Sequence, residues 1–388
     1  MNDKQKTGIT GFDSQSFGAK YFRGDKGFWI ILLLLSAISL LAVYSSTKDL
    51  FGRAVFVFIG LAIVWVVHLI KYTRYYYMSF IIYFVSIALL VLTLIVGATT
   101  NDATRWIKIP IINMTFQTSE FAKVALIMFL AYLFSEHQEK LKERATFLKI
   151  AICTVIPCGL IFLDNFSTAA ILFLVAWLMM LIVGIPAKYL FGLASSIILL
   201  GVFVIGLSFI VPKEYMPKPF SRVYTWKHRM ENFIKETPNA SEDLTTNFQE
   251  NQAKIAIAEG TENIIIGKMP GNSSQRYFLP HRESDFIYAF IIEEWGWVGA
   301  VLVLFAYLWI FRRCTLIARK CEKNFGMYLV LGFGLLYTIQ ALVNMGVSVT
   351  ILPVTGQTLP FVSAGGSSQI ITAVAFGIIL NISSQQDV

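Results

Sequence analysis

Long apolar runs separated by short polar segments make up most of the chain. A helix needs about 20 apolar residues to cross the hydrocarbon core of a bilayer, and fewer where flanking side chains reach back to the interface. The runs therefore predict an all-α, polytopic membrane protein with about ten transmembrane helices. The fifth and sixth runs nearly touch, so they could instead form one broken hairpin. The predicted spans are Phe28–Tyr44, Ala54–Ile70, Tyr75–Ala98, Phe116–Phe134, Ile150–Leu163, Thr168–Ile185, Tyr189–Val211, Phe286–Phe311, Phe325–Val347 and Ser367–Ile382.

The composition agrees with a protein that exposes most of its surface to lipid. Of the 388 residues, 56% are hydrophobic and only 14% are charged. A soluble domain carries roughly 25% charged residues, because its surface must be wetted. The composition therefore excludes an ordinary soluble domain.

Lysine and arginine are unevenly distributed between the two sets of connecting segments. One set is rich in them, whereas the short segments of the other set hold only Lys48, Arg53, Arg105 and Lys108. Because cytoplasmic loops carry the excess of Lys and Arg, the rich set is predicted to be cytoplasmic, with both chain termini inside. The net charge of +8 then reflects membrane topology, and no single basic stripe suggests a nucleic-acid partner.

The spans divide the chain into five predicted segments, one of them a large outer loop. A loop of this length in a compact bundle is usually functional or disordered. Within it, the run Leu244–Glu259 has a helical pattern. The segments are a cytoplasmic tail (1–27), helices one to seven (28–211), the large extracytoplasmic loop (212–284), helices eight to ten (285–382) and a second cytoplasmic tail (383–388).

Ionisable residues at membrane depth are functional hypotheses, because each costs at least about 2.5 kcal/mol to insert. Glu120 and Lys123 are three positions apart on one helical face and could neutralise each other, or Lys123 could pair with Asp164. We interpret them as a structural ion pair, and direct contact of Lys123 with a substrate is the alternative. Glu293 and Glu294, early in the eighth helix, are interpreted as packing and hydrogen-bonding anchors rather than as proton carriers.

The segment that leads into the eighth helix holds the densest group of charged and aromatic residues. In GNSSQRYFLPHRESDF, Asp285 stands at the outer start of that helix, and Arg276 and Arg282 precede it. The helix dipole favours a carboxylate there, so an N-terminal capping role is one interpretation. A substrate-binding role is supported equally, because such a cluster could bind a phosphate-bearing substrate at the membrane surface.

Two other outer segments carry residues suited to an anionic substrate. TTNDATRWIKIP places Arg105 and Lys108 around the interfacial Trp106, an arrangement that also suits a simple anchored loop. LPVTGQTLPFVSAGGSSQ places a Gly-Gly pair and Ser367 just before the last helix, where backbone N–H groups are available to an anion. Tight or re-entrant loops use the same residue types.

Taken together, these segments resemble the SEDS family of shape, elongation, division and sporulation proteins. The resemblance rests on motifs that follow one order: RWI, QTSEFAK, DNFSTA, QRYFLP with SDF, and LPVTGQTLPFVSAGGSS. It covers nearly the whole chain beyond the N-terminal tail. The last two motifs are most similar to the septal branch of the family, of the Bacteroidetes kind, and the elongation branch is the alternative.

The resemblance implies a peptidoglycan glycosyltransferase that joins lipid II units into glycan strands at the outer face of the bacterial cytoplasmic membrane. The family's essential acid is the aspartate of the SDF motif, which is Asp285 here. A positioned carboxylate can act as general base for the attacking 4-hydroxyl of the acceptor sugar. Arg105, Lys108, Arg276 and Arg282 are then expected to stabilise the pyrophosphate leaving group.

The resemblance also implies partners for this chain. They are a class B penicillin-binding protein, which is a transpeptidase, and other membrane proteins of the divisome. Neither the four cysteines nor any cluster of carboxylates predicts a metal site made by protein side chains alone. A divalent ion, Mg²⁺ or Mn²⁺, that is shared with the substrate pyrophosphate stays open.

The chain departs from the family pattern at two places. Where many relatives have an aspartate in the third motif, this chain has Asn165, with Asp164 displaced by one position. Where relatives have a glutamate and then a histidine before the essential aspartate, this chain has His281 and Glu283. The role of that glutamate therefore cannot be carried over, whereas the aspartate itself is intact.

Two other functions stay open at this stage. A lipid II flippase would line a polar path with Glu120, Lys123, Glu293 and Glu294. Transport sites lie near the midplane of the membrane, however, and the richest charge cluster here is at the outer surface. A non-catalytic scaffold for other division proteins is the third class.

Overall fold

The described part of the protein, in this computed structural model, comprises residues 23–47, 49–96, 98–100, 103–109, 114–210, 244–262, 266–280 and 282–385. The two predicted tails and the predicted large outer loop fall partly outside these residues. His281 also lies outside them.

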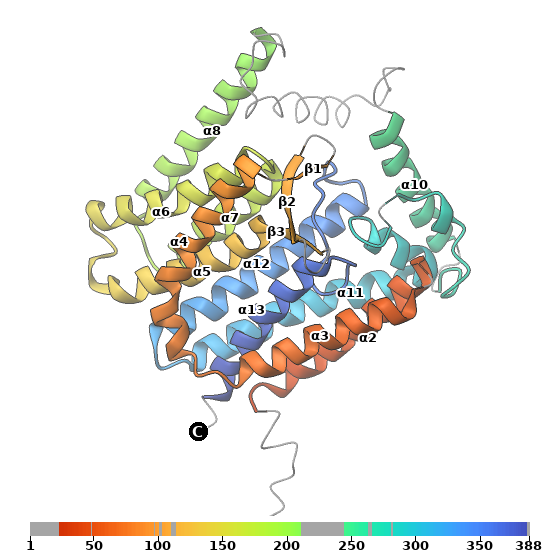
Figure 1. Ribbon diagram of the computed structural model, residues 1–388, viewed down its shortest axis with the longest axis horizontal. Helices are drawn as coiled ribbons and strands as arrows, with labels where there is room; N and C mark the ends of the chain where they lie inside the picture. The colour runs from red at the N-terminus through yellow and green to blue at the C-terminus, as the bar shows by residue number, and fades with distance from the viewer. Residues whose placement is uncertain are drawn as a thin grey trace, which may run out of the picture.

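Apolar helices form the body of the protein (Figure 1). Among the described residues, eight helices are long and apolar enough to cross a membrane, and α7 and α8 are two further apolar helices. Each lies on one of the predicted spans, which confirms the polytopic all-α class. Figure 1 shows α8 projecting away from the other helices, and α10, which corresponds to the predicted helical run of the outer loop, beside α11. The helices are α2 (Lys26–Thr47), α3 (Leu50–His68), α4 (Thr73–Val96), α5 (Thr118–Glu136), α6 (Arg144–Phe162), α7 (Phe166–Ile182), α8 (Ala187–Ile210), α10 (Leu244–Thr261), α11 (Ile287–Lys320), α12 (Asn324–Ser348) and α13 (Gly366–Ser384), with short 3₁₀ turns η1 (Gln138–Lys140) and η4 (Gln275–Tyr277).

Short polar residues explain where two of the helices begin. The Asp49 carboxylate accepts a hydrogen bond from Gly52 N at 2.9 Å before α3, and Asn165 Oδ1 accepts one from Thr168 N at 3.3 Å before α7. Such caps bind backbone N–H groups that have no partner within the helix. At the other end of α7, Gly184 adopts φ +88°, a left-handed conformation that glycine takes without steric cost. The fifth and sixth runs are therefore two separate helices joined by a tight turn at Asn165.

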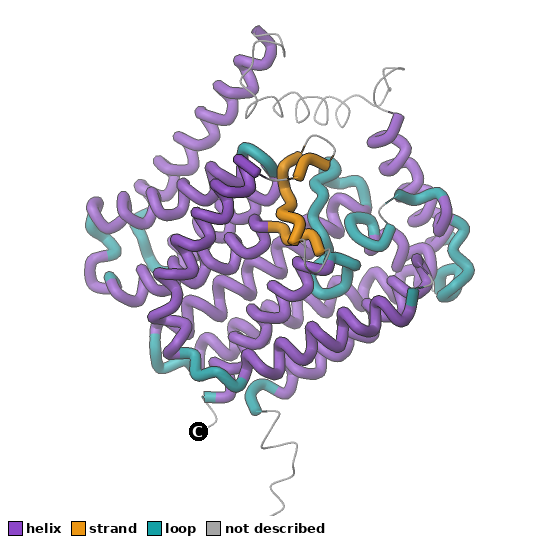
Figure 2. Tube along the Cα trace, viewed as in Figure 1, coloured by secondary structure: helices purple, strands orange, loops and turns teal. Residues whose placement is uncertain are grey.

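A small antiparallel sheet lies between α4 and α5. Its strands, β1 (Ala98–Thr100), β2 (Ala103–Ile109) and β3 (Met114–Gln117), are arranged in chain order. Figure 2 shows it in orange at one end of the bundle, next to loop segments. The predicted start of the fourth span at Phe116 is wrong, because Phe116 pairs with Ile107 across the sheet and α5 begins two residues later, at Thr118.

Helix α11 is broken at Gly296, which has φ 60° and ψ −148°. This region of backbone space is open almost only to glycine. The carbonyl groups of Glu293 and Glu294, in the turn before the break, accept hydrogen bonds from Lys268 N and Met269 N, each at 2.9 Å. The segment that follows α10, residues 266–280, is thereby joined to α11 and is called the outer segment below. Beyond the break the helix continues to Lys320, nine residues past the predicted end at Phe311.

The two ends of the described chain meet at the opposite end of the bundle. The Asp25 carboxylate pairs with the Arg313 guanidinium, whose Nε donates at 2.8 Å, and Asp25 N donates to Ser383 Oγ at 2.9 Å. An ion pair of this bidentate type is stronger than a neutral hydrogen bond. The first described residues, the end of α11 and the end of α13 thus lie on one side of the protein.

The break in α11 gives a test of the fold. Gly296→Ala places a Cβ at a backbone conformation that costs about 1–3 kcal/mol for other residues, so we expect a lower melting temperature in detergent. The control is Gly192→Ala in α8, where an added Cβ meets no atom within 4 Å. Alanine is the better helix former, so the control should leave the melting temperature unchanged or slightly raised. Equal melting temperatures for both variants would contradict a strained break.

Candidate functional site

Asp285 lies in the turn directly before α11 and is half-buried. The N-cap residue of α11 is Phe286, so Asp285 stands one position before the cap, and the capping interpretation is not supported. Its carbonyl oxygen accepts a hydrogen bond from Asn344 Nδ2 of α12 at 2.8 Å. The backbone of Asp285 is therefore fixed by a side chain from a different helix.

The two residues before Asp285 are held in the same way by the segment between α12 and α13. Ser284 O accepts from Ser363 Oγ at 2.6 Å. Glu283 O accepts from Ala364 N at 2.7 Å. With the bond from Asn344, three successive carbonyl groups that precede α11 are bound by donors of residues 344–364. The LPFVSAGGSS motif thus acts, in this structure, as a support for the backbone of Asp285.

Behind this turn, Glu120 and Lys123 of α5 form a buried ion pair. Lys123 Nζ lies 2.8 Å from Glu120 Oε1, and the two side chains are 1% and 6% exposed. Lys123 Nζ also donates to Gln340 Oε1 of α12 at 2.7 Å, and Ser368 Oγ of α13 donates to Glu120 Oε2 at 3.3 Å. Gln340 Nε2 in turn donates to Thr358 O at 3.0 Å. A buried pair of this kind needs further hydrogen bonds to its polar atoms, and Gln340 and Ser368 supply two of them.

The same network reaches α7 and the sheet. Gln357 O accepts from Asn344 Nδ2 at 2.7 Å, and Gln357 Nε2 donates to Thr168 Oγ1 of α7 at 2.6 Å. On the other side, Gln117 N of β3 donates to the buried Ser367 Oγ of α13 at 3.4 Å. Ser367, predicted as a substrate contact, thus joins the sheet to α13.

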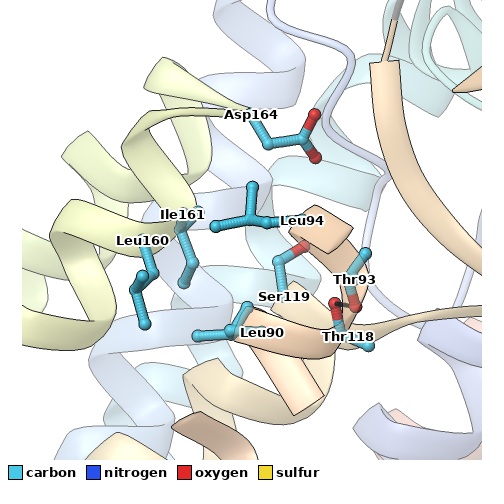
Figure 3. Close-up of a pocket in the computed structure, with 8 residues that line it drawn as sticks. All are labelled: Leu90, Thr93, Leu94, Thr118, Ser119, Leu160, Ile161 and Asp164. Atoms are coloured by element: carbon cyan, nitrogen blue, oxygen red, sulfur yellow. Dashed lines mark hydrogen bonds between the residues drawn. The ribbon is translucent and has the colours of Figure 1, made fainter. Parts of the chain in front are cut away.

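Asp164 is half-buried at the edge of a small, partly open pocket between α4, α5 and α6. The pocket has polar residues on one side and apolar residues of α4 and α6 on the other. Thr93 Oγ1 donates to Thr118 Oγ1 at 3.0 Å within it. Figure 3 shows Asp164 and Leu90 at opposite ends of the pocket. Of the two carboxylates considered for Lys123, Glu120 is the one in direct contact.

Glu293 anchors the outer segment to α11. Its side chain is fully buried, and its carboxylate accepts hydrogen bonds from Ser273 Oγ at 2.6 Å, Ser274 N at 2.7 Å and Gln275 N at 3.1 Å. A buried polar group is costly unless hydrogen bonds of this kind satisfy it. This geometry is that of an anchor.

Glu294 forms a second anchor, between the outer segment and the end of α2. Its carboxylate accepts from Gly271 N at 3.0 Å and from Ser45 Oγ. Arg276 Nη2 donates to the same Ser45 Oγ at 3.0 Å, and Arg276 is only 8% exposed. Arg276, predicted to bind substrate, is therefore buried within the support of the outer segment.

A half-buried ion pair joins the same segment to α10. Lys268 Nζ lies 2.6 Å from Glu259 Oε2, and Ser274 Oγ donates to the same oxygen. Desolvation of Glu259 by itself would raise the pKa of its carboxyl group. The hydrogen bonds from Lys268 and Ser274 and the Lys268 charge outweigh it, so this pKa lies below its ordinary value. The contact therefore keeps its charge at neutral pH.

The remaining basic residues of the prediction lie on two separate segments. Arg282 is half-buried and donates through Nε to Ser46 O at 3.0 Å. Arg105 and Lys108 are in β2, where Lys108 pairs with Thr115 of β3, and the side chains of both lie outside the described part of the chain.

Arg53 is a buried cation that the sequence pattern assigned to an outer loop. It lies in the first turn of α3 and is 4% exposed. Its guanidinium donates to Gln369 Oε1 at 2.7 Å, to Val362 O at 2.9 Å and, through Nε, to Ser39 Oγ at 3.0 Å. Arg53 thus holds the segment that binds the backbone before Asp285. An arginine directly before an apolar run was the available signal.

Gln340 and Asn344 are the other residues that sequence reasoning missed. They are four positions apart on α12, so they lie on one face of the helix, and each is 1% exposed. Two amides at this spacing in an otherwise apolar span could have been recognised as a polar stripe facing the interior.

The buried ion pair gives a test of the network. Lys123→Met leaves the Glu120 carboxylate without its partner, and loss of one member of a buried pair costs about 3–5 kcal/mol. We expect a strongly reduced yield of folded protein and a lower melting temperature. The double variant Glu120→Gln/Lys123→Met, which removes both charges, should recover much of the loss. If the double variant were as unstable as the sum of its single variants, the two charges would not be coupled.

Comparisons with known proteins agree with this architecture. The family model for FtsW, RodA and SpoVE proteins, described as "Cell cycle protein", matches residues 25–388. A relative from Trichlorobacter lovleyi, named probable peptidoglycan glycosyltransferase FtsW, is 32% identical over 362 residues, which are 91% of this chain and 89% of the relative. The protein of the same name from Bacillus subtilis is 32% identical over 302 residues, 77% of this chain and 72% of the relative.

Two solved structures share the fold. A chain from a peptidoglycan synthase complex superposes with a TM-score of 0.74 at 24% identity and covers 94% of this chain and 98% of its own length. The rod shape determining protein RodA of Thermus thermophilus superposes with a TM-score of 0.65 at 21% identity, covering 95% of this chain and 99% of its own. With the family match over nearly its whole length, the chain belongs to the FtsW/RodA/SpoVE family of membrane-embedded cell cycle proteins.

Proposed function

We propose that this protein is a peptidoglycan glycosyltransferase that polymerises lipid II into glycan strands during septal cell-wall synthesis, at the outer face of the cytoplasmic membrane. Several relatives at about 30% identity over most of the chain carry the name of that activity. The observation that carries the proposal is Asp285, a half-buried carboxylate directly before α11, in a turn where the carbonyl groups of residues 283, 284 and 285 each accept one hydrogen bond.

Asp285 is the proposed general base. Transfer requires the 4-hydroxyl of the acceptor sugar to lose its proton as it attacks the anomeric carbon of the donor. A carboxylate held by a rigid backbone can meet that hydroxyl with little loss of entropy at the moment of reaction. A single displacement of this kind inverts the anomeric configuration, so an α-linked lipid donor yields a β-linked strand.

The pyrophosphate leaving group needs positive charge or N–H groups as it departs. Arg282, which precedes Asp285 by three residues and is half-buried, is the nearest proposed contact in the sequence. Arg105 and Lys108 on β2 are the other two. Arg276 is assigned to the anchor instead, because it is buried against Ser45.

A divalent ion, Mg²⁺ or Mn²⁺, remains part of the proposal only as a companion of the substrate pyrophosphate. Among the described residues, no three His, Cys, Asp or Glu side chains lie close enough together to hold a metal. The hard oxygen atoms of a pyrophosphate are ligands that suit Mg²⁺.

Transport of lipid II is the weaker candidate. A transport path needs charges that can change partners near the midplane. Glu120 and Lys123 neutralise each other, and Glu293 is saturated with hydrogen bonds from the outer segment. These geometries support a rigid frame around Asp285 better than a polar path.

The same proposal includes location and partners. Asp25, Arg313 and Ser383 meet at one end of the bundle, and Arg23, Lys26 and Arg312 are their neighbours in the sequence, which supports a cytoplasmic position for both termini. A class B penicillin-binding protein is the proposed partner that cross-links the new strand, together with other membrane proteins of the divisome. One of the fold's solved counterparts is described as part of a peptidoglycan synthase complex.

Asp285→Asn tests the catalytic role. The amide keeps the size of the carboxylate and cannot accept a proton, and general-base catalysis contributes about 10²–10⁴-fold. We expect strand synthesis from purified lipid II to fall to about a hundredth of wild type or less, with normal yield and melting temperature. The control is Glu322→Gln, which neutralises an exposed carboxylate at the other end of the bundle and should leave synthesis unchanged. Activity of Asp285→Asn above about a tenth of wild type would rule out the general base.

A further inference from the structure

The hydrogen bonds of Asn344 fix the orientation of its side-chain amide. Its Nδ2 donates to two carbonyl oxygens, Asp285 O at 2.8 Å and Gln357 O at 2.7 Å. Because both partners are acceptors, the amide must turn its NH₂ group towards them. Its Oδ1 is buried and makes no hydrogen bond to the described residues. The hydrogen bonds of this side chain therefore go to two carbonyls, one of which belongs to Asp285.

We propose that Asn344 is a positioning residue for the reaction, one that sets the Asp285 carboxylate through the Asp285 backbone. This inference rests on the proposed function of Asp285. Asn344 is 1% exposed, so it lies behind the turn and has no surface to offer a substrate. Its effect must pass through Asp285, whose side-chain direction follows from the backbone that Asn344 holds.

Asn344 also connects Asp285 to the buried ion pair. Gln340, one helical turn earlier on α12, accepts from Lys123 Nζ at 2.7 Å and donates to Thr358 O at 3.0 Å. Asn344 binds the neighbouring carbonyl, that of Gln357, at 2.7 Å. Successive carbonyls of the loop are thus held by successive amides of one helix face, which fixes the loop relative to α5 and α11 together.

The physical reason to expect a catalytic effect is the precision that proton transfer requires. A general base must come within about 2.6–3.2 Å of the hydroxyl that it deprotonates. A displacement of about 1 Å at a catalytic group can lower the rate by about 10²-fold. Loss of the Asn344 bonds would release both the Asp285 carbonyl and the loop that supports the residues before it. The effect should therefore fall on kcat and not on KM.

Asn344→Asp is the sharpest variant. It has nearly the same shape, but as a carboxylate it has no donor and presents oxygen atoms to two carbonyl oxygens. We expect kcat for lipid II polymerisation to fall by about 10- to 100-fold with KM changed less than about twofold. Asn344→Ser, which is neutral and keeps one donor, should give an intermediate kcat, and it serves for the same comparison if Asn344→Asp does not fold.

The matched control is Asn381→Asp at the far end of α13. Asn381 is a buried amide, 2% exposed, whose Nδ2 donates to His68 O at 2.5 Å. It has the same chemistry in the same bundle but lies near the chain termini. We expect the melting temperature of the Asn381→Asp variant to fall as it does for the Asn344 variants. Its kcat per folded molecule should stay at the wild-type value.

Three outcomes would overturn the positioning role. They are an unchanged kcat in the folded Asn344 variants, an equal loss of kcat in Asn381→Asp, or a rise of KM at constant kcat. Asp285→Asn is measured beside them. If Asp285→Asn is inactive and the Asn344 variants are fully active, only this inference fails. If Asp285→Asn is active, the proposed base fails whatever the Asn344 variants show.

Discussion

The carbonyl groups of residues 283–285 have no helical partners, because they precede α11. A backbone carbonyl that is shielded from water is costly unless a donor binds it. The chain satisfies these groups with donors from residues 344–364. That requirement fixes the loop between α12 and α13 against the start of α11, and the position of Asp285 follows from it.

Two polar networks support this turn from different sides. The inner one runs from the Glu120–Lys123 pair through Gln340 to the loop that carries Gln357 and Thr358. Each charge in it is neutralised locally, which is the condition under which ionic groups are stable in a low-dielectric interior. Burial of these charges costs desolvation free energy. In return, the network makes the backbone around Asp285 rigid.

The outer network joins the segment after α10 to the first turns of α11. Glu293 and Glu294 supply both their carboxylates and their carbonyls, the latter bound by Lys268 N and Met269 N before the break at Gly296. The break is needed because a regular helix would use those carbonyls itself. The first turns of α11, which follow Asp285, are therefore held between the interior network and the outer segment.

The sequence alone determined the features that depend on local pattern. Apolar runs predict the spans because each helix must cover the hydrocarbon core by itself, and Asp285 could be singled out because it ends a charged, aromatic segment at a helix start. The strands near Phe116, the burial of Arg276 and the roles of Arg53, Gln340 and Asn344 depended on tertiary structure. The partners of the buried polar side chains are far away in the chain: Lys123 and Gln340 are separated by 217 positions, and Arg53 and Gln369 by 316. A polar residue in an apolar run indicates that a partner must exist, but only the packing of the helices decides which one it is.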